Sequence, residues 1–248
     1  MKNLRVLLII LGVGAFFAFI SPPKFLDFDT PVLSASVNGN GDEVKKEMDL
    51  DPFHSIGLSI PADVILMQGK TQKVEIDAES NIIDNIKTKV KNGSWEIKFK
   101  ERVKKHDDIT IYITIPDLRA VSIAGSGDVM TKGAFTGLDG LAVSIAGSGD
   151  VKLESESSSV SVSVAGSGDV VMTGNTNKVD VSIAGSGDVN LKDLVSGGCD
   201  ISIAGSGNCK VNTNGPLDIS IVGSGDVYYT GDAKVHSSIM GSGNVHKM

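Results

Sequence analysis

The chain has few cysteines, few aromatic residues and few prolines for its 248 residues. Its two cysteines are too few to make a disulfide framework. Aromatic residues make up 5% of the chain, whereas glycine occurs 29 times. This composition favours thin, tightly turned β layers over a bulky helical core. Because 41% of the residues are apolar, a sizeable core can still form.

An excess of positive charge is also absent. The 23 Lys and Arg residues are outnumbered by 30 Asp and Glu residues, which gives a net charge of -7. Binding to phosphate groups needs clustered basic side chains, so this balance disfavours nucleic acid and anionic lipid as partners. It is compatible with cation binding.

The N-terminal apolar run is shorter than a typical membrane span. Lys2 and Arg5 precede the 15 residues 6–20, whereas a span usually needs about 20. A basic start followed by an apolar run of this length is typical of an export signal. We therefore predict a signal peptide or N-terminal anchor over residues 1–20 and a linker over residues 21–43. The predicted location is the periplasm, the outer membrane or the cell surface.

Residues 44–118 alternate apolar and polar side chains and predict a β-rich leading segment. The expected strands cover residues 56–60, 64–67, 74–78, 95–99 and 109–115. Asn92-Gly93 predicts a hairpin turn between Val90 and Trp95. Residues 81–84 predict a short helical turn that Asn81 could cap.

The strongest pattern is the tetrapeptide Gly-Ser-Gly-Asp/Asn, which recurs at intervals of 18 to 22 residues over residues 119–248. Such a period indicates stacked units, each of which buries its apolar face against a neighbour. The repeat glycines are Gly125, Gly127, Gly147, Gly149, Gly166, Gly168, Gly185, Gly187, Gly205, Gly207, Gly223, Gly225, Gly241 and Gly243. Because glycine permits positive φ and close stacking, we interpret these residues as structural turns.

Each unit reads as a strand, a corner, a second strand and a return loop. Before the corner, apolar residues such as Val121 and Ile123 alternate with serines such as Ser122. Coils of about 20 residues stacked at strand spacing, about 4.8 Å, form a parallel β-helix. The predicted fold is therefore all-β, a right-handed parallel β-helix preceded by the β-rich segment. Propeller blades need about 40 residues each, which disfavours that alternative.

The last residue of each tetrapeptide should form a column along the solenoid. Its members are Asp128, Asp150, Asp169, Asp188, Asn208, Asp226 and Asn244. Stacked carboxylates repel one another unless they are hydrogen-bonded, protonated or bridged by a cation. Two readings therefore stay open, a structural ladder of turn-forming side chains or a calcium ladder; we expect no other cofactor.

Three further features leave alternatives open. Cys199 and Cys209 take positions that are apolar in other repeats, so they predict two buried thiols or a disulfide. The four histidines show no metal-ligand spacing. The last repeat leaves little chain to cover the solenoid end, which would then expose strand edges and could join a second copy of the chain.

Several segments resemble the putative auto-transporter adhesin head GIN domain family, DUF2807. They are residues 53–69, the sequences VEIDA at 74–78, NIID at 81–84 and ITIPDL at 113–118, and the repeated AGSGDV. The resemblance covers about residues 45–245. It implies an exported bacterial protein with a β-helical fold, and it brings no binding residues with it.

These observations predict a non-catalytic exported protein of the cell envelope or surface, acting as a structural or adhesion module. Its expected partner is an envelope glycan or protein. A calcium- or glycan-binding module is one alternative. A β-helical carbohydrate-active enzyme is another, but it would need paired carboxylates in a groove walled by long loops. The return loops here are short, and we predict no catalytic residues.

Overall fold

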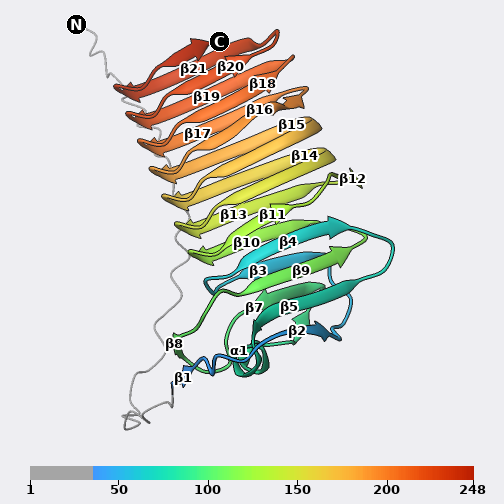
Figure 1. The fold of residues 1–248 in the computed structure, drawn as a ribbon. Helices are drawn as coiled ribbons and strands as arrows, with labels where there is room; N and C mark the ends of the chain where they lie inside the picture. The colour runs from blue at the N-terminus through green and yellow to red at the C-terminus, as the bar shows by residue number, and fades with distance from the viewer. Residues whose placement is uncertain (1–35) are drawn as a thin grey trace, which may run out of the picture. The chain divides into compact units, whose positions relative to one another are not determined.

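Parallel strands stack one above another along the repeats (Figure 1). The computed structural model describes residues 36–248, so the predicted signal segment and residues 21–35 of the predicted linker lie outside the described part. The fold is 65% strand and 3% helix, a β-solenoid of about 7 turns with parallel bridges about 19 residues apart. The predicted all-β parallel β-helix is confirmed.

The strands and the helix have the following bounds. They are β1 Val37–Asn38, β2 Glu43–Met48, β3 Ser55–Leu58, β4 Asp63–Gln68, β5 Lys73–Glu79, α1 Ser80–Asn85, β6 Val90–Lys91, β7 Ser94–Ile97, β8 Val103–Lys105, β9 Thr110–Ile115, β10 Ala120–Gly125, β11 Asp128–Thr131, β12 Phe135–Leu138, β13 Leu141–Gly147, β14 Val151–Gly166, β15 Val170–Gly185, β16 Val189–Ser196, β17 Cys199–Gly205, β18 Cys209–Thr213, β19 Pro216–Gly223, β20 Val227–Thr230, β21 Lys234–Gly241 and β22 Val245–Lys247.

The strands that precede each corner form one ladder, which we call the upstream ladder. It runs through β10, β13, the second half of β14 and of β15, then β17, β19 and β21. Identical positions stack in register, so that Val162 pairs with Val181 and Val181 with Ile201. These side chains are at most 4% exposed, and each contributes about 1.5–3 kcal/mol by leaving water.

The strands that follow each corner form a second, downstream ladder through β11, β14, β15, β16, β18, β20 and β22. Its inward column includes Val151, Val170, Val189 and Val227, all at most 1% exposed. The two ladders enclose one core between them.

The leading segment joins both ladders, and its two coils stack out of sequence order. In the upstream ladder β3 lies between β7 and β10, and in the downstream ladder β4 lies between β9 and β11. The coil at residues 94–115 therefore forms the base, and the coil at residues 55–68 separates it from the repeats (Figure 1). Asp63 pairs with Asp128 and so occupies the position of a repeat aspartate, although no Gly-Ser-Gly sequence precedes Asp63.

Antiparallel strands close the base of the solenoid. β5 pairs with β9, β2 pairs with β5, and β6 pairs with β7. The predicted hairpin at Asn92-Gly93 is confirmed, with φ of 51° and 70° at the two turn residues. The cap formed by β2, β5 and α1 thus covers strand edges that would otherwise be unpaired.

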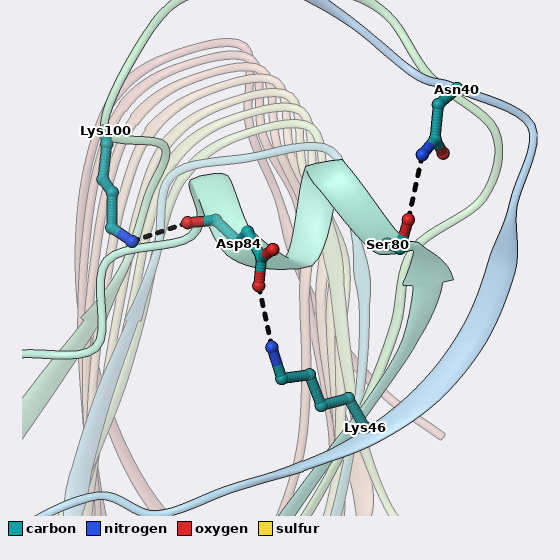
Figure 2. A network of polar contacts seen from close by, with 5 residues as sticks. All are labelled: Asn40, Lys46, Ser80, Asp84 and Lys100. Atoms are coloured by element: carbon teal, nitrogen blue, oxygen red, sulfur yellow. Dashed lines mark hydrogen bonds and ion pairs between the residues drawn. The ribbon is translucent and has the colours of Figure 1, made fainter.

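Helix α1 is held in the cap by polar contacts (Figure 2). Lys46 donates to a carboxylate oxygen of Asp84 at 2.7 Å, Lys100 donates to its main-chain oxygen at 2.6 Å, and Asn40 donates to the Ser80 hydroxyl at 2.9 Å. The predicted capping role of Asn81 is wrong, because the helix begins one residue earlier and Glu79 is the N-cap, without a side-chain cap bond. The Asn81 amide instead donates to the carbonyl of Asn38 at 2.7 Å.

Glu79 binds two segments beside the cap, at Gly41 and Asp107, and we expect it to make the free energy of unfolding depend on pH. Its carboxylate accepts hydrogen bonds from the main-chain N–H groups of Gly41 at 2.7 Å and Asp107 at 3.0 Å. The bonds from Asp107 and Gly41 hold the pKa of this carboxyl below its ordinary value. A depressed folded-state pKa adds stability above the unfolded pKa, about 4.3, and this contribution is lost as pH falls through the folded value.

Glu79→Gln should therefore destabilise the protein at pH 7, and its difference from the unchanged protein should shrink below about pH 4. Urea unfolding at pH 7 and pH 3.5 measures this. Glu43→Gln, at an exposed position on β2, is the control and should change little at either pH. An equal loss for Glu79→Gln at both pH values would contradict the prediction.

Candidate functional site

The predicted Asp and Asn column forms a continuous hydrogen-bonded ladder at the corners. In each step, the side-chain Oδ1 of one coil accepts a bond from the main-chain N–H of the matching residue in the next coil. The donor–acceptor pairs are Asp150–Asp128 at 2.8 Å, Asp169–Asp150 at 2.9 Å, Asp188–Asp169 at 2.8 Å, Asn208–Asp188 at 2.8 Å, Asp226–Asn208 at 3.0 Å and Asn244–Asp226 at 2.8 Å. The oxygens thereby satisfy N–H groups that the corner would otherwise leave without a partner.

Because the ladder needs only a side-chain oxygen as acceptor, Asn can replace Asp, as it does in two coils. Asn208 accepts the N–H of Asp226 as an aspartate would, because both side chains carry an Oδ1 acceptor. Within residues 36–248, no group of three or more His, Cys, Asp or Glu side chains could hold a metal ion. The hydrogen bonds from coil to coil account for the ladder without a cation, and we predict that added calcium leaves the melting temperature unchanged.

Asp169 offers a direct test of the ladder. Asp169→Ala removes the acceptor for the N–H of Asp188 and should cost about 1–2 kcal/mol of unfolding free energy. Asp169→Asn keeps the acceptor and should cost much less. Urea unfolding of both variants, with and without calcium, measures the effect. Equal losses would show that the charge of Asp169, rather than its hydrogen bond, stabilises the corner.

The first glycine of each corner has a positive φ, between 136° and 145° across the seven repeats. The main-chain oxygen of Gly125 accepts bonds from Ser148 at 2.9 Å and Gly149 at 3.2 Å in the next coil. At the second glycine, a Cβ on Gly168 would overlap the carbonyl oxygen of Gly149. Apart from Gly125, the repeat glycines thus lie where a side chain would overlap the main chain of the neighbouring coil.

A shallow trough of about 590 Å³ lies on the outer face of the upstream ladder, from β14 to β21. We call it the serine trough. Its lining includes two columns of polar side chains, which are stacked by the register of the parallel strands. One contains Ser163, Ser182, Ser202, Ser220 and Ser238; the other contains Ser161, Asp180, Asp200, Asp218 and His236. Polar groups therefore repeat at the strand spacing, about 4.8 Å.

The alternation in the sequence predicts that the serines lie on the outer face, but it does not single out the three aspartates. A signal was present, because Asp180, Asp200 and Asp218 each stand two residues before a repeat serine. Taken alone, each aspartate is typical of a solvent-exposed strand position. Only the register of the strands shows that the three form a column.

The charges in the serine trough are unevenly compensated. Lys178 donates to Asp180 at 3.0 Å and lies 2.9 Å from Asp200. The hydrogen bond with Asp200 is the larger cause, and that with Asp180 the next, of the raised pKa of the Lys178 ammonium group. Among the ion pairs of residues 36–248, none involves Asp218. The carboxylate of Asp218 and the neighbouring hydroxyls can therefore accept and donate hydrogen bonds to a ligand rich in hydroxyl groups.

Both cysteines are free thiols in the core. Burial, with a smaller contribution from Asp200, raises the pKa of Cys199 to about 12, and burial raises the pKa of Cys209 well above its ordinary value. Since the thiolate is the reactive form, neither should react with a thiol reagent at pH 8 while the protein is folded. Both should react after unfolding in guanidinium, as counted by Ellman's reagent. Fast labelling of the folded protein would contradict this.

The solenoid, its corner ladder and its serine-rich face define a repeat protein that presents a regular outer surface. The chain belongs to the family described as putative auto-transporter adhesin, head GIN domain (DUF2807), whose pattern matches residues 52–233. The family is described by adhesion rather than by an enzymatic activity. The curated proteins contain no match to the chain.

Solved structures of similar fold include proteins from Bacteroides and Parabacteroides species. A putative adhesin from Bacteroides fragilis NCTC 9343 has a TM-score of 0.81 at 21% identity, and the match covers 86% of this chain and 100% of that one. A putative lipid binding protein from Parabacteroides distasonis ATCC 8503 has a TM-score of 0.74 at 25% identity, with the same coverage. A putative adhesin from Parabacteroides merdae ATCC 43184 has a TM-score of 0.69 at 20% identity, covering 86% of this chain and 99% of that one.

Within residues 36–248, no helix is long and apolar enough to cross a membrane.

Proposed function

We propose that the protein is a non-catalytic adhesion module, exported to the bacterial envelope or surface, whose serine trough binds an envelope glycan. The observation that carries the proposal is the trough itself, in which hydroxyl and carboxylate groups repeat from coil to coil. A glycan is also a repeating chain, and its hydroxyls pair with such groups. The basic start and the apolar run of residues 6–20 support export.

In residues 36–248 the hydrogen bond between a histidine and a serine joins His54 to Ser55 at 3.0 Å, and neither residue lines the trough, whose histidine is His236. A serine nucleophile would need a base within hydrogen-bond reach, about 2.6–3.2 Å. The arrangement therefore supports binding better than nucleophilic catalysis.

The test is a glycan array and a pull-down of envelope fractions with the full-length protein. Ser202→Arg places a long charged side chain at the centre of the serine trough and should abolish binding. Ser144→Arg is the matched control, because Ser144 lies in the same column on β13 but outside the lining of the trough. Equal binding by the two variants would exclude the trough as the glycan site.

Because the chain is similar to a putative lipid binding protein, a second experiment measures binding to phosphatidylcholine vesicles. We expect no retention on vesicles, because buried aliphatic side chains fill the space between the ladders. Retention on vesicles without glycan binding would replace the glycan proposal with a lipid one.

A further inference from the structure

The two ends of the solenoid differ. Antiparallel strands close the base, whereas β21 pairs only with β19, and β22 only with β20, within residues 36–248. An unpaired strand presents a row of free N–H and C=O groups that can accept another strand. The edge of β21 is eight residues long and pairs with β19 without a register shift, so it is straight and regular.

The direction of the main-chain groups on β21 follows from its bonds to the previous coil. The N–H groups of Lys234 and Ser242 both point to the previous coil, where they bond Gly215 and Gly223 at 2.9 Å. Because these groups alternate along a strand, the even-numbered residues face β19. The odd-numbered residues Val235, Ser237 and Ile239 therefore direct their N–H and C=O groups toward the free edge.

Two apolar side chains of β21, Ile239 and Met240, lack cover. Leu217, Ile219 and Ile221 of β19 are at most 4% exposed, whereas Ile239, stacked on Ile221, is 41% exposed. The outward neighbour Met240 is 74% exposed. Ser237 takes the place of Ile219 and is the polar exception in the inward row.

We propose that β21 pairs with β21 of a second copy, antiparallel about Ser237, and joins two solenoids end to end. In this register Val235 lies opposite Ile239 of the other copy, so the inward apolar row continues from one core into the next. Ser237 lies opposite its own counterpart on the two-fold axis. These are the residues whose main-chain groups face the edge, and each opposed pair exchanges two N–H···O bonds.

The outward face fits the same register. His236 lies opposite Ser238, and Lys234 lies opposite Met240, so that no like charges meet across the axis. An isologous contact of this kind uses one surface twice and closes after two copies. The structure therefore favours a dimer over an open filament at this end.

The test uses the full-length chain and single cysteine substitutions, because the native thiols are buried. In Ser237→Cys the two Cα atoms would lie about 5.5 Å apart, which is within the range of a disulfide. Mild oxidation should give a covalent dimer on a non-reducing gel. Ser220→Cys is the control, because its counterpart lies about three strand spacings away, roughly 14 Å, and cannot be bridged.

A second substitution in the Ser237→Cys background separates specific pairing from chance collision. Ile239→Lys places an unpaired charge opposite Val235 and should lower the cross-linked fraction by about tenfold. Met130→Lys is the matched control, because Met130 on β11 is 42% exposed, close to the 41% of Ile239. Equal cross-linking of Ser237→Cys and Ser220→Cys overturns the proposal, whether another segment of the chain or a different protein covers β21.

Discussion

Gly166→Ala is expected to lower the free energy of unfolding by about 3–5 kcal/mol, a large effect for one methyl group. Gly166 has a φ of 140°, which strains any residue that carries a Cβ. A Cβ at this position would also overlap the carbonyl oxygen of Gly147 in the coil beneath. Because the obstacle is backbone, neither coil can relieve the overlap by rotating a side chain.

Gly125→Ala separates the two causes. Gly125 has the same φ of 140°, but no atom lies within 4 Å of a Cβ built there. It should therefore show only the conformational strain, about 1–3 kcal/mol. The difference between the two variants, read from urea unfolding, measures how closely the coils stack. Equal losses would show that strain alone explains the glycines.

Trp95→Ala is expected to cost about 3–5 kcal/mol, because it opens a cavity at the base of the core. Trp95, on β7, is the only tryptophan and is fully buried. Its ring lies 5.7 Å from that of Phe53, and its indole N–H donates to the carbonyl of Lys87 at 2.9 Å. Loss of the side chain removes both the packing between coils and the bond to the hairpin.

Trp95→Phe separates the contribution of packing to this loss from that of the hydrogen bond. Phenylalanine keeps most of the apolar volume but leaves the Lys87 carbonyl without its donor, so we expect about 1–3 kcal/mol. Chemical unfolding followed by far-ultraviolet circular dichroism suits both variants, since they lack the tryptophan signal. A loss for Trp95→Phe as large as that for Trp95→Ala would mean that the hydrogen bond, rather than packing, fixes the base.

The fold of the repeats could be predicted because their period, their alternation and their glycines all indicate the same stacked coil. The 18 to 22 residue period set the coil length, the alternation of Val121 and Ile123 with Ser122 set the inward face, and the glycines set the corners. The stacking order of the leading coils was not predictable. β3 and β7 have similar alternating sequences, and neither carries the tetrapeptide that would fix its neighbour.

The candidate site was predictable only in part. The serine column follows from alternation alone, whereas the trough needs the register that aligns Asp180, Asp200 and Asp218. The error at Asn81 has a similar origin. An asparagine near a helix start predicts a cap, but the Asn81 side chain instead contacts Asn38, 43 residues away.

The insertion of β3 between β7 and β10 has a consequence for the order of folding. Neighbouring repeats meet about 19 residues apart, whereas Ser55 meets Ser94 and Ala120, 39 and 65 residues away. Closing such long loops has a higher entropy cost, so the base should be the slow, nucleating step. Later coils would then add one at a time, each on the coil before it, and unfolding of the monomer would begin at β21 and β22.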